Sequence, residues 1–95
     1  MAFLVVPALA GDQINVTFKN RSGYDVAFYL NGGDGLETTL ADGSSQSYSV
    51  EVDPGVEPIV RIHQPEGDDL DFWIEDGGSY VFRMQNGRIV NDYDE

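Results

Sequence analysis

The chain has 95 residues, of which seventeen are Asp or Glu and five are Lys or Arg, giving a net charge of -12. Phosphate contacts need a basic face, so this balance argues against direct nucleic-acid binding and favours basic proteins or divalent cations as partners. The length fits one small domain. The sequence has no cysteine, which excludes disulfides, thiolate chemistry and Cys-ligated metals.

The apolar segment Met1–Ala10 at the start of the chain has two interpretations. Its Ala8-Leu9-Ala10 ending is typical of a signal-peptidase site, so we expect export to the periplasm or the cell exterior, with a cytoplasmic protein as the alternative. In the second interpretation, Phe3–Val6 forms a buried strand that Pro7 ends. The segment is too short to span a membrane. We expect residues 11–95 to form a single β-sandwich domain.

After this segment, apolar and polar residues alternate in short runs, which is the period of a β-strand with one buried face. No window has helical periodicity over a useful length. The strands expected from this alternation are, in chain order, 14–19, 24–30, 36–40, 47–52, 59–63, 70–75, 80–84 and 88–91.

Turn signals between these runs predict hairpins. Three tripeptides that end in glycine each separate two expected strands: Arg21-Ser22-Gly23, Ala41-Asp42-Gly43 and Asp76-Gly77-Gly78. A three-residue hairpin loop commonly ends in a left-handed residue, for which glycine is favoured. We therefore expect Phe18 to lie opposite Val26, and Phe72 opposite Phe82. Asn86-Gly87 predicts a two-residue type I′ hairpin. Together these signals predict an all-β fold, a small antiparallel β-sandwich or a partly open barrel of about 7–8 short strands.

The sequence carries none of the catalytic signatures that we sought: no phosphate-binding glycine loop, no nucleophile elbow and no two-histidine zinc motif. The single histidine, His63, falls beside Arg61 on the outer face of an expected strand, which is typical of a solvated surface residue. Paired carboxylates can hydrolyse glycosides, but seventeen acids produce close pairs by chance. We expect a protein that is not an enzyme and that has no cofactor other than calcium.

Calcium is considered as a ligand because the segment from Glu66 to Asp76 contains six acids, and hard cations take oxygen ligands from such loops. The candidate ligands are Asp68, Asp69 and Asp71. The spacing lacks the glycine that an EF-hand has at its bend, and the alternative interpretation is a solvated acidic loop.

The expected hairpins also predict a binding surface on the outer face of the last three strands. In that ribbon Trp73 lies opposite Val81. Asp71 lies opposite Arg83, which in turn faces Val90. An apolar centre with a charged rim is the usual anatomy of a protein-binding patch, and Trp and Arg are frequent anchors. The alternative is that a neighbouring element covers this face.

Three functions remain open from the sequence. The first is a non-enzymatic, exported module that binds a protein partner, or another copy of itself, through the outer face around Trp73. Tyr29, outward on an earlier strand, would extend that face. The second is a small acidic inhibitor that mimics nucleic acid and blocks a basic target protein. The third is a calcium-dependent adhesion or carbohydrate-binding module, with Tyr29 as a platform on which a sugar could stack.

Overall fold

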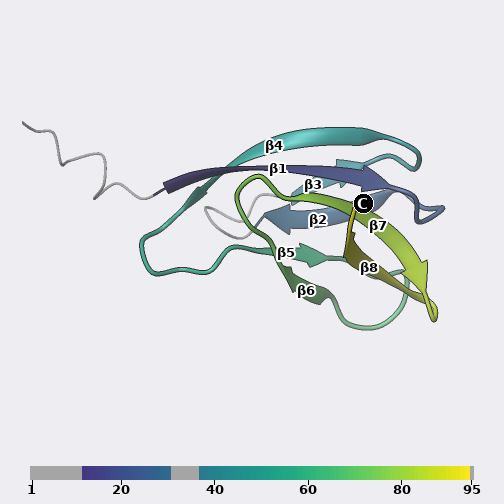
Figure 1. The fold of residues 1–95 in the computed structure, drawn as a ribbon. Coiled ribbons are helices and arrows are strands. Elements are labelled where there is room, and N and C mark those ends of the chain that lie inside the picture. The colour runs from purple at the N-terminus through teal and green to yellow at the C-terminus, as the bar shows by residue number, and fades with distance from the viewer. Residues whose placement is uncertain (1–11, 31–36, 95) are drawn as a thin grey trace, which may run out of the picture.

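The protein is described here from a computed structural model, which defines residues 12–30 and 37–94. These residues form eight strands in two four-stranded sheets (Figure 1), so the expected all-β sandwich is confirmed. Within the same two ranges there is no helix long and apolar enough to cross a membrane. The segment Met1–Ala10, and with it the choice between a signal remnant and a strand, lies outside the described residues.

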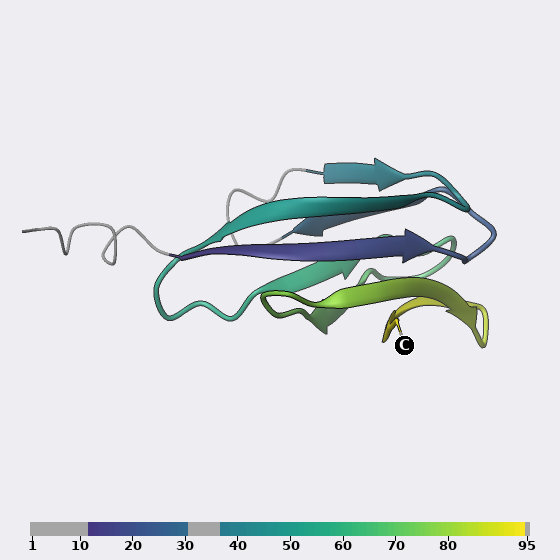
Figure 2. The same cartoon turned by 45° about the horizontal axis from the view of Figure 1, so that its top comes forward.

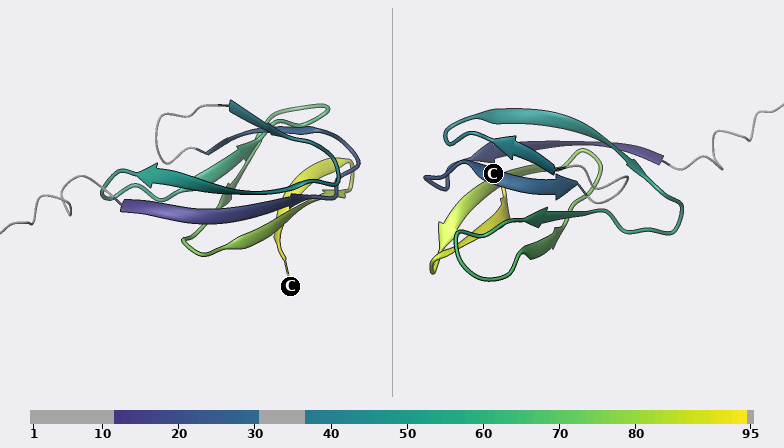
Figure 3. Two further views of the ribbon diagram at one scale, coloured as in Figure 1. Left: turned by 90° about the horizontal axis from the view of Figure 1, so that it is seen from above. Right: turned by 180° about the vertical axis from the view of Figure 1, so that it is seen from behind.

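The first sheet has the order β4-β1-β7-β8. Its strands are β1 (Asp12–Asn20), β4 (Ser45–Val52), β7 (Ser79–Gln85) and β8 (Arg88–Tyr93). β1 and β4 are antiparallel and run side by side for most of their length (Figure 2). β1 and β7 are parallel, which the expectation of a purely antiparallel fold did not include. The β7–β8 hairpin curves over one side of the molecule (Figure 3).

The second sheet has the order β3-β2-β5-β6 and is antiparallel throughout. Its strands are β2 (Val26–Leu30), β3 (Glu37–Leu40), β5 (Ile59–Ile62) and β6 (Leu70–Trp73). They are shorter than those of the first sheet, but their inward residues are as well buried. Val26, Phe28, Val60 and Ile62 are each at most 1% exposed.

The three glycine-ending turns do not form the expected hairpins. β1 and β2 lie in opposite sheets, as do β3 and β4, and β6 and β7, so each turn carries the chain from one sheet to the other. The final glycine takes the expected left-handed conformation in two of these turns, with φ of 89° at Gly23 and 81° at Gly43. In the third turn the left-handed residue is Gly77, with φ of 80°, and not the final Gly78. Asn86-Gly87 does form the predicted hairpin, with both residues left-handed as a type I′ turn requires.

The core explains why alternation alone did not identify the strand pairs. Phe18 does not lie beside Val26 in one sheet, and instead packs across the core against Phe28, with ring centroids 5.4 Å apart. The Phe82 ring lies 5.0 Å from the Phe18 ring and 5.3 Å from the Phe28 ring, and all three side chains are fully buried. Two apolar faces satisfy the same pattern whether their strands pair within a sheet or face each other between sheets.

A buried asparagine fixes two of the three crossovers. The Asn20 side-chain amide donates to the carbonyl oxygens of Tyr24, at 2.7 Å, and Leu40, at 2.8 Å. Its Oδ1 accepts from the Ser22 backbone N–H at 3.0 Å and from the Ser22 hydroxyl at 2.7 Å. Asn20 therefore ties the crossover that follows β1 to the end of β3, and its own side chain is 0% exposed.

Candidate functional site

The residues expected to form one patch are divided between the two sheets. Trp73, Asp71 and Tyr29 lie on the second sheet, and β7 and β8 of the first sheet carry Val81, Arg83 and Val90. The expected opposition of Trp73 to Val81, and of Asp71 to Arg83, is wrong, because β6 pairs with β5 and not with β7. The opposition of Arg83 to Val90 is confirmed.

On the first sheet, charged side chains surround the valine at the centre of the expected patch. Val81 is 0% exposed. Lys19 on β1 forms an ion pair at 2.8 Å with Asp94, which follows β8, so this pair joins the two strands that flank β7. The pair also holds the pKa of Asp94 below its ordinary value. Val81 therefore offers no apolar surface to a partner.

The outward side chains of the second sheet form a continuous surface around Trp73. Val60 and Ile62 of β5 point into the core, so Ile59, Arg61 and the adjoining His63 point outward. Trp73 lies opposite Ile59, and Asp71 lies opposite Arg61. We call this surface the Trp73 face and define it by eight residues: Tyr29, Glu37, Ile59, Arg61, His63, Asp69, Asp71 and Trp73.

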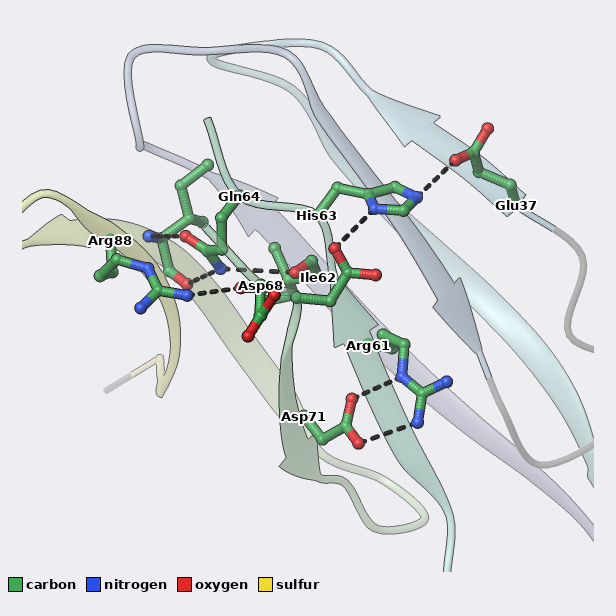
Figure 4. Close-up of polar contacts among 10 residues, drawn as sticks. Glu37, Arg61, Ile62, His63, Gln64, Asp68, Asp71 and Arg88 are labelled. Carbon is green, nitrogen blue, oxygen red and sulfur yellow. Dashed lines mark hydrogen bonds and ion pairs between the residues drawn. The ribbon is translucent and has the colours of Figure 1, made fainter. Parts of the chain in front are cut away.

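Arg61 and Asp71 form a two-point ion pair in the middle of the Trp73 face (Figure 4). The Arg61 Nε–H donates to Asp71 Oδ1 at 2.7 Å, and Nη2 donates to Oδ2 at 3.0 Å. The pair raises the pKa of Arg61 and lowers the pKa of Asp71. Both side chains are over 40% exposed, so the pair adds little stability, but its two parallel bonds fix the orientation of both groups.

His63 lies between two carboxylates that come from different parts of the sheet (Figure 4). Its Nε2 is 2.8 Å from Glu37 Oε2 on β3, and its Nδ1 is 2.8 Å from Asp69 Oδ1 in the segment before β6. Both ring nitrogens can donate at once only in the imidazolium form. The hydrogen bond to Asp69, and then the one to Glu37, accordingly raise the pKa of His63. The Tyr29 ring meets the imidazole edge-on, with centroids 5.2 Å apart.

Trp73 is the most exposed large apolar side chain among the described residues, at 73% exposure. Ile59, directly opposite on β5, is partly exposed and adds apolar area beside the indole. The indole of Trp73 is exposed to solvent and does not pack in the core, whereas the charged side chains beside it form ion pairs. It is the feature of this face that most resembles a binding anchor.

Two of the three side chains suggested as calcium ligands are bonded to other side chains in the structure. The Asp69 carboxylate is bonded to His63 and the Asp71 carboxylate to Arg61. Asp68 accepts a hydrogen bond from Arg88 through its backbone carbonyl (Figure 4). In the part of the chain that the structure describes, no three acidic or histidine side chains come together to hold a metal ion.

Sequence reasoning did not place five members of the Trp73 face in the binding surface: Glu37, Ile59, Arg61, His63 and Asp69, the last of which it considered only as a calcium ligand. Alternation with Val60 and Ile62 did place Arg61 and His63 outward together, and this was the available signal. The acids that they bind come from strands whose pairing the sequence did not reveal. His63 was therefore interpreted as a solvated residue, although it joins two elements of the sheet.

Comparison with models of known protein families and with curated proteins found no match to this chain.

Proposed function

We propose that the protein is a non-enzymatic binding module that uses the Trp73 face to bind a protein surface rich in Lys and Arg. The observation that carries the proposal is the 73% exposure of Trp73 on a face whose neighbouring charged groups are already paired. Trp is the side chain most often found as a binding hot spot, because it buries a large rigid area on association.

The paired charges around Trp73 favour binding because they preorganise the surface. Association costs free energy when flexible side chains become ordered at an interface. Arg61 and His63 are already held by carboxylates, so a partner would meet side chains with little freedom left to lose. The same bonds speak against catalysis, because the only histidine of the chain has a carboxylate at each ring nitrogen.

The charge of the chain selects the kind of partner. Glu57 and Glu75 are exposed and lie close in sequence to Ile59 and Trp73, and the chain as a whole carries a net charge of -12. A Lys or Arg side chain of the partner could contact the indole face and pair with these acids. A nucleic-acid mimic is less well supported, since the carboxylates within the face are bonded to Arg61 and His63. The proposal that this module is exported rests on Met1–Ala10 alone.

The test begins with peptides selected from a displayed random library against the wild-type protein. Their affinities are then measured for the wild type, Trp73→Ala and Tyr24→Ala. Tyr24 is a matched control, since it is 53% exposed on the crossover after β1 and away from the Trp73 face. Trp73 is the only tryptophan, so its fluorescence reports directly on its burial by a bound peptide.

We expect Trp73→Ala to weaken binding by roughly thirtyfold, the equivalent of about 2 kcal/mol at a hot spot, and Tyr24→Ala to have almost no effect. The selected peptides should be enriched in Lys and Arg and should bind less tightly as salt is raised. The urea midpoint of Trp73→Ala should match that of the wild type, since an exposed side chain adds little to the core. Equal binding by the two variants, with both folded, would refute the proposal.

A further inference from the structure

β4 is the longest of the four strands at the edges of the sheets. It has eight residues, against four in β3, four in β6 and six in β8. Among residues 12–30 and 37–94, β1 is the one strand that pairs with it, so its other edge has no partner there. This free edge runs along the upper margin of the molecule in Figure 1.

The direction of each β4 backbone group follows from the ladder with β1. The Asn20 N–H donates to the Ser44 carbonyl at 2.9 Å, and the Asn20 carbonyl accepts from the Gly43 N–H at 2.8 Å. Hydrogen bonds alternate along an antiparallel ladder, so the even-numbered residues of β4 bond to β1. The backbone groups of Ser45, Ser47, Ser49 and Glu51 therefore point to the free edge.

This edge lacks the devices by which sheet proteins usually prevent edge-to-edge pairing, such as Pro, Lys or a bulge. β4 contains neither Pro nor Lys, and its register with β1 runs without interruption from Val52 to Ser45. The Ser47 and Ser49 hydroxyls are bonded to side chains of β1, both at 2.8 Å, which holds them away from the edge. The other edge strands are shorter.

We propose that β4 pairs with β4 of a second copy of the chain, antiparallel about a twofold axis at Tyr48. In this register Ser47 lies opposite the partner's Ser49, and Ser45 lies opposite the partner's Glu51. Outward side chains then meet outward ones, as a sheet requires. Four opposed pairs have their backbone groups directed at each other, and each pair exchanges two hydrogen bonds. A twofold axis at Ser49 would provide three such pairs.

Side-chain packing favours a second copy at this edge, and the composition of β4 limits the charge repulsion between the copies. Two chains of charge -12 repel each other, and β4 has one charged residue, Glu51, in eight, so it brings few acids together. The two Tyr48 residues would face each other across the axis, at a position where opposed side chains are closest. Tyr48 is partly buried, and its ring already contacts Phe18 and Phe28. Pairing would extend this aromatic cluster from one copy into the other.

The test compares Ser47→Pro with Ser47→Ala. Both variants lose the hydroxyl bond to Thr17, but Pro alone removes the N–H that points to the free edge. The bonds from β4 to β1 are made by even-numbered residues, so neither change removes one. Pro is tolerated on an edge strand for this reason. Oligomeric state is measured by sedimentation equilibrium over a range of protein concentrations at physiological salt.

We expect the wild type and Ser47→Ala to form a dimer, and Ser47→Pro to dimerise roughly tenfold more weakly or not at all, because each copy loses a hydrogen bond. Hydrogen exchange in the wild type gives a second readout that needs no variant. The amides of Ser47 and Ser49 should become protected as concentration rises, whereas those of Tyr48 and Val50 should be protected at every concentration. A wild type that stays monomeric, or equal dimerisation of the two variants, would overturn the proposal. It does not depend on the Trp73 face, which lies on the other sheet.

Discussion

Replacing Asn20 by Ala should cost about 3 kcal/mol of folding free energy. The side chain makes four hydrogen bonds at a position with no solvent exposure. Each contributes roughly 0.5–1.5 kcal/mol net, and a buried group that loses its partner costs roughly 1–3 kcal/mol. The Ser22 hydroxyl lies 3.1 Å from the Tyr24 carbonyl oxygen, so its one proton can turn to that oxygen when Asn20 Oδ1 is removed. The Ser22 N–H loses its acceptor, and the Leu40 carbonyl loses a donor. The four bonds together correspond to roughly 2–6 kcal/mol, and the partner that the Tyr24 carbonyl gains places the expected loss in the lower half of that range.

Urea unfolding measures this loss, and Asn15→Ala is the matched control. Asn15 is also on β1, but it is exposed, and its side chain accepts one hydrogen bond, from Ser49. For a urea slope of about 1–1.5 kcal/mol per molar, the Asn20 variant should unfold roughly 2–3 M earlier than the wild type. The Asn15 variant should shift by less than about 0.5 M. Similar shifts for the two variants would show that the buried network does not hold the crossovers as described.

Two further measurements test other parts of the structure. NMR titration of the single histidine should give His63 a pKa above its ordinary value of 6.5, with Asp69→Asn lowering it more than Glu37→Gln. The stability that these bonds provide should be complete below pH 6.5 and lost as the pH rises through the folded-state pKa, so a pKa at or below 6.5 would contradict the assigned contacts. Gly78→Ala should cost about 1–3 kcal/mol in urea unfolding, because the new methyl group would collide with the buried Tyr80 ring; a loss under about 0.5 kcal/mol would disprove that contact.

The sequence predicted where the strands lie and which side of each is buried, because period-two alternation is a local property. Apart from the β7–β8 hairpin at Asn86-Gly87, it did not predict which strands pair. Gly23 supplies the left-handed final residue that a three-residue hairpin needs, but the same conformation also serves a crossover between sheets. Alternation and turn glycines are compatible with both arrangements. The choice between them depends on how the Phe rings pack across the core.

The candidate site shows the same division between local and long-range information. The outward position of Trp73 was predicted from its own strand and is confirmed by its exposure. The burial of Val81 was not predicted, because β7 lies between β8 and β1, and the parallel pairing that places Lys19 beside Val81 was not expected. The ion pair between His63 and Glu37 likewise required knowing that β2 lies between β3 and β5.

The two proposed surfaces belong to different sheets and use different groups, so each can serve as a control for the other. The Trp73 face presents side chains from the outer face of the β3-β2-β5-β6 sheet, whereas the β4 edge presents backbone groups at the margin of the other sheet. Pairing through β4 would leave the Trp73 face of each copy uncovered. Ser47→Pro should therefore not change the affinity of one copy for a selected peptide, and Trp73→Ala should not change the oligomeric state. If Ser47→Pro changed the peptide affinity, or Trp73→Ala changed the oligomeric state, the two surfaces would be coupled through the core. Their location on different sheets would then not make the two surfaces independent.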